Sequence, residues 1–221
     1  MKNFINLLIV SLLATILFSC AYEKNIVKGE FLDDLILKDL KDGRSFTLVK
    51  QFRYLDPQNT LWVVPVDEIV DGASIPRGLW SIVGGPWEGV YRRSSVIHDY
   101  FFRTKKYNSD EVHRVFYDAM LTEGVSLLKA KAMYFAVLKY NGEWQQQAFV
   151  PCADQIEPGR NVAGMRCLPV ADPDNLPHKW VLNKVPFDEE EFKRAAKIIE
   201  DRNLSPEEIE EMAKNLESFL P

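Results

Sequence analysis

Apolar and polar positions alternate along the first part of the chain and then change to a helical spacing. Between residues 31 and 66, apolar side chains recur at every second position, which is typical of half-buried β-strands. This even spacing is seen at Phe46, Leu48, Phe52 and Tyr54. Asp42-Gly43 is a hairpin turn signal, so the pattern predicts an N-terminal antiparallel β-hairpin or sheet.

The spacing becomes helical from Tyr91, where apolar residues begin to recur on one helix face. A second helix is predicted from about Ser109 to Leu121, and Ser126 begins a third that runs to about Tyr140. Asn141-Gly142 is the stop signal of that third helix. These segments predict a helical bundle and, together with the preceding strands, place the chain in the α+β class.

The last part of the chain combines a loop-rich stretch with two helices. Residues 143–187 show little periodicity apart from one predicted strand at Trp180–Val185. Asp188 and Ser205 each stand three residues before a glutamate, which is the capping-box signal of a helix start. Residues 188–221 are therefore predicted to form a helical hairpin. The hairpin is either a docked cap with a solvated acidic face or a partner-binding surface.

An apolar run from Phe4 to Phe18 has the length of a signal-peptide core and is too short to span a bilayer comfortably. It leads into Leu17-Phe18-Ser19-Cys20, which resembles a bacterial lipobox. The resemblance implies cleavage before Cys20 and acylation of Cys20 by chains such as palmitate. The alternative is an ordinary secretory signal with an incidental cysteine. Several acyl chains on one residue anchor a protein stably, so a lipid bilayer is an expected partner. Ala21, by resemblance to enterobacterial sorting, favours the outer membrane, facing the periplasm.

The chain has three cysteines, and acylation of Cys20 would leave Cys152 and Cys167 as a pair. In an oxidising compartment a disulfide is favoured over metal binding by two isolated cysteines. The disulfide would close a loop of about 15 residues, which is worth ~3 kcal/mol in the chain-entropy model. We therefore expect a disulfide loop between the helical bundle and the C-terminal helices.

These signals predict four segments along the 221 residues. Residues 1–19 are a lipoprotein signal peptide, 20–30 a tether, 31–187 a single α+β domain and 188–221 the C-terminal helical hairpin. The net charge is −5, and the hairpin contributes −6 from 5 basic and 11 acidic residues, which leaves about +1 for the rest. Because no basic stripe is present, nucleic acid is not an expected partner. An envelope protein or a cell-wall component is the partner that the compartment suggests.

Two short motifs concentrate the candidate chemistry. Asp71-Gly72-Ala73-Ser74-Ile75-Pro76 is typical of a turn that leads into a helix, and His98-Asp99-Tyr100 places a histidine beside a carboxylate. His113 lies on the next predicted helix and could face His98 if the two helices are antiparallel neighbours. Structural alternatives stay open: a turn carboxylate at Asp71, a half-buried His98 bonded to a carbonyl, and an ion pair of Asp99 with Arg103, four residues away.

Two reactions would use these residues. In the first, His98 is a general base that activates water, and His113 or Asp71 orients its ring. In the second, His98, His113 and a carboxylate of Asp71 or Asp99 bind a divalent metal such as calcium or zinc. The chain contains no Gly-x-Ser-x-Gly, His-Glu-x-x-His or P-loop motif, which argues against the usual serine esterases, zincins and NTPases.

The same residues resemble a bacterial and phage family known as domain of unknown function 1353. The family's motifs correspond here to Val64-Pro65, Asp71 to Pro76, Trp80, Gly85-Pro86, His98 to Arg103 and the helix Val112 to Met120. The resemblance covers about residues 45–140 and implies no established activity. Two positions depart from the family pattern: Val70 replaces a threonine, and His113 replaces an aspartate. The second departure makes a strict His–Asp dyad doubtful.

A weaker likeness is to small secreted bacterial phospholipases of the A-two class. It would make His98 the base, Asp99 a metal ligand and His113 the counterpart of the dyad aspartate. The supporting disulfides and the glycine-rich calcium loop of those enzymes are absent. Three hypotheses follow: an envelope hydrolase, a non-catalytic envelope lipoprotein that binds a partner, and a phage-derived surface protein.

Overall fold

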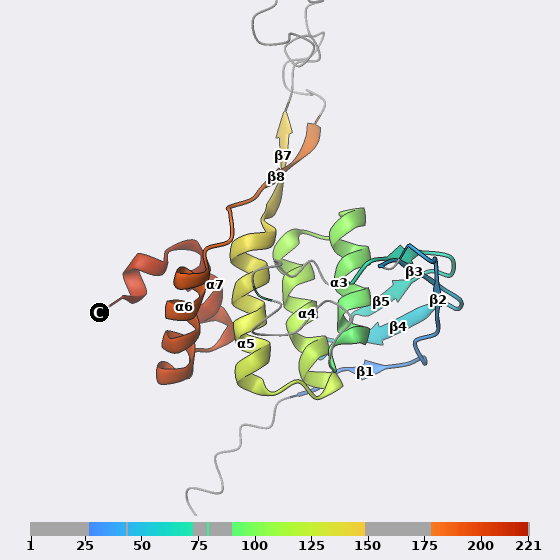
Figure 1. Ribbon diagram of the computed structural model, residues 1–221, viewed down its shortest axis with the longest axis horizontal. Helices are drawn as coiled ribbons and strands as arrows, with labels where there is room; N and C mark the ends of the chain where they lie inside the picture. Colours follow the sequence, from blue (N-terminus) through green and yellow to red (C-terminus); the bar gives the residue numbers. More distant parts are fainter. Residues whose placement is uncertain (1–26, 43, 73–78, 80–89, 149–177, 221) are drawn as a thin grey trace, which may run out of the picture.

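The computed structural model describes residues 27–42, 44–72, 79, 90–148 and 178–220 (Figure 1). The predicted signal peptide, Cys20, the Cys152–Cys167 loop and the Ala73–Pro76 part of the first motif lie outside the described residues. Within the described residues the fold is mixed α+β: small antiparallel sheets come first and five helices follow. The predicted fold class is therefore confirmed at this level.

Two three-stranded antiparallel sheets form the N-terminal layer. The first sheet has the order β1 (Glu30–Phe31), β4 (Phe52–Leu55), β5 (Leu61–Val64). The second has the order β2 (Leu37–Asp39), β3 (Phe46–Leu48), β6 (Ile69–Val70). The β2–β3 pair is the hairpin that the turn signal predicted. In β4 the alternation of buried and half-buried side chains matches the even spacing of the sequence, because successive strand residues point to opposite faces.

The turn between β4 and β5 is held by one aspartate. The carboxylate of Asp56 accepts hydrogen bonds from the backbone N–H groups of Gln58 and Thr60, at 2.9 and 2.7 Å. Its second oxygen accepts from the indole Nε1 of Trp62 at 2.9 Å. Such an aspartate replaces the backbone bonds that a turn lacks, which fixes the register of the two strands.

Three helices lie beside the sheets. They are α3 (Arg92–Thr104), α4 (Ser109–Glu123) and α5 (Leu127–Ala136), which continues as the π-helical segment η2 (Val137–Asn141). Helix α4 begins with a capping box of Asn108 and Glu111 and ends at Gly124, whose φ of 96° suits glycine.

Helix α3 starts without a side-chain cap of its own and is capped by the neighbouring helix. The carboxylate of Glu123, the last residue of α4, accepts from the N–H groups of Arg93 and Ser94 at 2.9 and 3.0 Å. Free N–H groups at a helix start favour a negative partner, so this contact sets α3 and α4 antiparallel with their ends together.

The C-terminal part adds a hairpin and two more α-helices. Strands β7 (Glu143–Ala148) and β8 (His178–Asn183) pair and extend beyond the end of the helices (Figure 1). Helices α6 (Glu189–Arg202) and α7 (Pro206–Lys214) follow, and a short 3-10 turn, η5 (Leu216–Phe219), closes the chain. The caps at Asp188 and Ser205 are confirmed, whereas β7 falls in a stretch predicted as loop.

Two apolar clusters form the core. One joins the two sheets to α3 and one side of α4, with Tyr54, Val64 and Ile97 fully buried. The other lies among α4, α5, α6 and α7, with Tyr134, Phe192 and Ile209 fully buried. Helix α4 contributes to both clusters, so it occupies the centre of the molecule. Within the described residues, no helix has both the length and the apolar character needed to cross a membrane.

Candidate functional site

His98 of α3 and His113 of α4 meet in the interior. The Nε2 of His98 lies 3.0 Å from the Nδ1 of His113, and both residues are completely buried. The Nε2 of His113 lies 3.4 Å from the carbonyl oxygen of Gly142. The antiparallel packing of α3 and α4 thus brings the two candidate histidines together.

The Gly142 carbonyl sets the proton positions in this chain of contacts. A carbonyl oxygen can only accept, so the Nε2 of His113 donates to it. The Nδ1 of neutral His113 is then an acceptor, and the Nε2 of His98 must donate. His98 consequently keeps a lone pair on Nδ1, a buried atom with no hydrogen-bond partner among the described contacts.

Gly142 has to be glycine for this contact. Its φ is +85°, a conformation that other residues rarely adopt, and a Cβ there would clash with the backbone oxygen of Asn183. The site therefore depends on the start of the β7–β8 hairpin, a strand pairing that was not predicted from the sequence.

Aromatic rings surround the histidine pair. The ring of His98 stacks on that of Phe102, with 5.4 Å between the ring centres, and its centre lies 4.8 Å from that of Phe116. Burial lowers the pKa of His113 to about 4, and burial together with the adjacent His113 ring lowers the pKa of His98 well below its usual value. Both imidazoles are therefore neutral at pH 7.

The two candidate carboxylates occupy a different place. Asp99 accepts a hydrogen bond from the backbone N–H of Asp71 at 2.9 Å. The carboxylate of Asp71 pairs with Arg44 at 2.6 Å, and its side chain is 41% exposed. Adjacent residues of a helix point about 100° apart, so His98 and Asp99 face different surroundings. The predicted convergence of His98, His113 and Asp71 on one point is not seen.

Burial raises the pKa of Asp99 to about 7, against the opposing contribution of the Asp71 N–H. The proposed ion pair of Asp99 with Arg103 is not seen, because Arg103 binds Glu68 at 2.6 Å. Arg103 acts on Asp99 only at longer range, as one of the charges that lower its pKa. Asp99 is thus a buried acid that titrates near neutrality beside the strand end of β6.

A three-ligand metal site does not form at these residues. Among the part of the chain that the structure describes, no group of three or more His, Cys, Asp or Glu side chains could hold a metal ion. The nitrogens of His98 and His113 bond to each other, while Asp99 is committed to the Asp71 N–H. The metal-ligand role expected for Asp99 therefore has no geometric support in the described residues.

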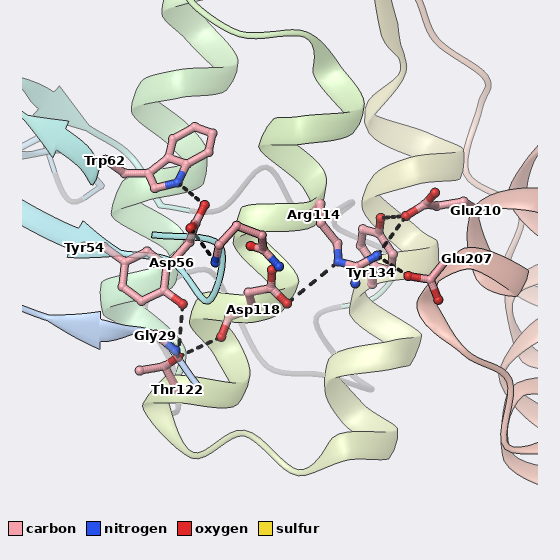
Figure 2. Close-up of polar contacts among 11 residues, drawn as sticks. Gly29, Tyr54, Asp56, Trp62, Arg114, Asp118, Thr122, Tyr134, Glu207 and Glu210 are labelled. Carbon is pink, nitrogen blue, oxygen red and sulfur yellow. Dashed lines mark hydrogen bonds and ion pairs between the residues drawn. The ribbon is translucent and has the colours of Figure 1, made fainter. Parts of the chain in front are cut away.

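A second polar cluster, partly exposed, lies on the other side of α4, and it was not among the candidate sites predicted from the sequence (Figure 2). Arg114 contacts Glu207 and Glu210 of α7, at 2.9 and 3.3 Å, and Asp118 of its own helix at 3.8 Å. The hydroxyl of Tyr134 donates to Glu210 at 2.6 Å. The Arg114–Asp118 spacing of four residues was a visible helix-pair signal, but nothing in the sequence pointed to α7 as the partner.

The same helix also fixes the N-terminal strand. The Oγ1 of Thr122 in α4 accepts a hydrogen bond from the backbone N–H of Gly29 at 3.1 Å. The same atom lies 3.0 Å from the hydroxyl oxygen of Tyr54 (Figure 2). A Cβ at Gly29 would collide with the carbonyl oxygen of Leu55 and the hydroxyl of Tyr54, which explains the glycine. The start of the described chain is therefore held against the C-terminal turn of α4.

The family comparison covers the region that holds both histidines. Residues 46–137, from β3 to the end of α5, match a family described as "Protein of unknown function (DUF1353)". This part of the chain belongs to the DUF1353 family. The predicted resemblance, over about residues 45–140, is confirmed. His98, Asp99, His113 and Asp71 all lie inside the family region, whereas Gly142 and helices α6 and α7 lie outside it.

Two similar curated proteins come from Sinorhizobium fredii. The uncharacterized protein y4jT is 47% identical over 131 residues, which cover 59% of this chain and 37% of y4jT. The uncharacterized protein y4iH is 34% identical over 154 residues, which cover 69% of this chain and 59% of y4iH. The matched regions thus span less than two thirds of either relative. No solved structure matches the chain significantly.

Proposed function

We propose that this protein is a lipid-anchored protein of the bacterial cell envelope whose α+β region is a non-catalytic binding module. The observation that carries the proposal is the burial of His98 and His113, which are 0% exposed and bonded to each other. A general base has to reach the proton that it removes, directly or through one water. A pair that is closed to solvent and neutral serves better to join two helices than to activate water.

The surroundings of the pair support a packing role. Phe102 contacts both imidazoles, and its ring also packs on Trp144 at 4.5 Å. A buried hydrogen-bonded pair inside an aromatic shell specifies how α3, α4 and the β7–β8 hairpin fit together. In this proposal the family motif His98-Asp99 stabilises the fold. The partner, an envelope protein or cell-wall component, binds the outer surface.

Envelope anchoring rests on the lipobox-like end of the leader. Growth with an alkyne-tagged palmitate should label the full chain, and Cys20→Ser should remove the label. Labelling that persists in the Cys20→Ser chain, or that never appears, would contradict anchoring through this residue. A Cys152→Ser variant is the matched control, because it removes a cysteine and leaves the lipobox intact.

The role of the histidine pair is tested by its protonation. In long-range ¹H–¹⁵N spectra of the labelled protein, both imidazoles should carry their proton on Nε2 between pH 5 and 8, with peaks assigned through His98→Gln and His113→Gln. Free histidine would become half protonated near pH 6.5. An imidazole of the pair that titrates near that pH would contradict the burial that supports a packing role.

An envelope hydrolase is the second candidate, and the free Nδ1 lone pair of His98 is the observation in its favour. In this arrangement His98 would be the base, and His113, itself bonded to the Gly142 carbonyl, would orient its ring. Purified protein should be incubated with peptidoglycan, phospholipid vesicles and an unfolded polypeptide. Hydrolysis that His98→Gln abolishes without lowering the unfolding temperature would establish the hydrolase and overturn the binding-module proposal; no such turnover is expected.

A further inference from the structure

We propose that the end of the molecule where β1 begins binds the surface of an anionic phospholipid bilayer. The proposal rests on the anchoring of the chain through Cys20, and it concerns a surface separate from the histidine pair. We call this end the anchor-side surface and define it by Val27, Lys28, Val90, Leu127, Leu128 and Lys129.

These residues gather at one end because four chain segments meet there. The N–H of Gly29 binds Thr122 in the last turn of α4, and α5 starts four residues after that helix ends. The Glu123 carboxylate binds the first turn of α3 at the same end. Figure 1 shows β1, the start of α3, the end of α4 and the start of α5 together at the lower edge of the bundle.

The anchor-side surface exposes apolar side chains next to lysines. Val27 is 70% exposed, Val90 56% and Leu128 43%. The ammonium of Lys129 lies 5.1 Å from the centre of the Tyr91 ring. Exposed aliphatic groups beside lysines are the combination that enters the interface of an anionic membrane.

A groove between α5 and α6 opens beside this surface. Its volume is about 500 Å³, and Leu128, Ala132, Phe192 and Ala196 line its apolar part. Lys129, Lys193 and Lys197 stand along it, with Glu200 as the acidic lining residue. Lys193 also pairs with Glu189 and Glu190, and Lys197 with Asp201, in exposed ion pairs that hold these side chains only weakly. An apolar groove lined by three ammonium groups suits the tail and phosphate of a phospholipid.

Chain length places this end nearest to the anchor. Val27 follows Cys20 by seven residues, and a chain spans at most ~3.6 Å per residue, so Val27 lies within about 25 Å of an acylated Cys20. Other exposed apolar residues, Leu182 of β8 and Val185 just after it, belong to the end of the molecule from which the β7–β8 hairpin extends, opposite the end where β1 begins (Figure 1). The bilayer is therefore the one partner that the tether holds next to the anchor-side surface.

The test uses the chain from residue 20 onward with Cys20→Ala, which has no acyl group and retains every described residue. Flotation with vesicles of phosphatidylcholine containing one quarter phosphatidylglycerol should recover the protein, whereas pure phosphatidylcholine vesicles should recover little. Leu127→Ser/Leu128→Ser should weaken binding at least tenfold. Lys129→Glu should weaken it about fivefold or more on anionic vesicles, since each surface lysine is worth about that factor.

Leu182→Ser/Val185→Ser is the matched control, because it removes two aliphatic residues of similar exposure, 43% and 44%, from the β7–β8 end of the molecule. It should bind anionic vesicles like the parent chain. Equal binding by all variants, or no binding to anionic vesicles, would overturn the inference. The palmitate labelling tests the anchor independently of this result. If the chain is labelled but its unacylated form does not bind vesicles, the anchor is supported and the anchor-side surface is contradicted. If the chain is not labelled but its unacylated form floats with anionic vesicles, the surface is supported and the anchor is contradicted.

Discussion

Helix α4 carries two polar clusters on neighbouring residues, one fully buried and one partly exposed, and they are built in opposite ways. His113 meets His98 of α3 in a fully buried, uncharged pair. Arg114 turns to α7 and meets Glu207 and Glu210 in a charged, partly exposed network. One helix thus holds an uncharged polar pair on its buried side and a set of paired opposite charges on its partly exposed side.

The difference follows from access to water. Where solvent is excluded, desolvation disfavours the charged form of a histidine, so the pKa falls and the ring stays neutral. Where the side chains are still partly exposed to solvent, a guanidinium keeps its charge and forms ion pairs with carboxylates. Burial raises the pKa of Asp118 to about 6, while nearby Arg114 opposes that rise. The two clusters should therefore respond differently to truncation, pH and salt.

The largest expected effect is on the uncharged side. His113→Ala removes a buried ring packed on Phe102 and leaves the Nε2–H of His98 and the Gly142 carbonyl without their partner. We expect the free energy of unfolding to fall by about 4 kcal/mol, as for other large-to-small changes in a core. Urea unfolding of both proteins measures this loss.

The coupling between the two rings provides the control. His98→Ala combined with His113→Ala should cost less than the sum of the two single losses, because the second change removes a group already unpaired. Strictly additive losses would mean that the rings do not depend on each other.

An intermediate effect is expected from pH. Wild type should be compared with His98→Leu/His113→Leu, which fills a similar volume with groups that do not titrate. Because the folded-state pKa of His113 is about 4, the unfolded chain binds its proton first as the pH falls from 6.5. Wild type should therefore lose about 3 kcal/mol relative to the variant between pH 6.5 and pH 4 from His113 alone.

Asp99 and Asp118 have raised pKa values, and their effect on stability has the opposite sign. Their contribution is fully present below their unfolded pKa and is lost as the pH rises through about 7 and about 6. Both carboxylates are present in the two proteins, so they cancel in the difference. A difference that is constant from pH 6.5 to 4 would contradict the buried neutral pair.

The smallest effect is expected on the charged side. Arg114→Met retains the apolar stem but removes the cation from Asp118, Glu207 and Glu210, and should cost about 2 kcal/mol at low salt. The loss should shrink in 0.5 M NaCl, because salt screens the exposed part of the network. The loss from His113→Ala should stay the same in that salt, and a parallel response of both variants would remove the contrast between the clusters.

Local signals in the sequence predicted much of the fold. Even spacing located β3 and β4, and the helix starts at Ser109 and Pro206 follow from side chains that cap within three residues. The meeting of His98 with His113 also followed from two helices joined by a short turn. The distance along the chain is short in each case, so one or two residue types decide the outcome.

Long-range partners were not predictable in the same way. Strand β7 has a polar sequence, Glu-Trp-Gln-Gln-Gln-Ala, and becomes a strand by pairing with β8 some thirty residues later. The complete burial of His98 depends on rings from α4, and the tie of Arg114 to α7 spans 93 positions. Spacing within one element does not encode which distant element will cover it.

The contact of Glu123 with the start of α3 has a consequence for the order of folding. The residues that it joins are 29 and 30 positions apart, and the histidines are 15 apart, so the α3–α4 hairpin closes short loops. Gly29 reaches Thr122, and Arg114 reaches Glu207, only across 93 positions. Formation of the α3–α4 hairpin should therefore precede the docking of β1 and α7, and substitutions at Glu123 should slow refolding more than they speed unfolding.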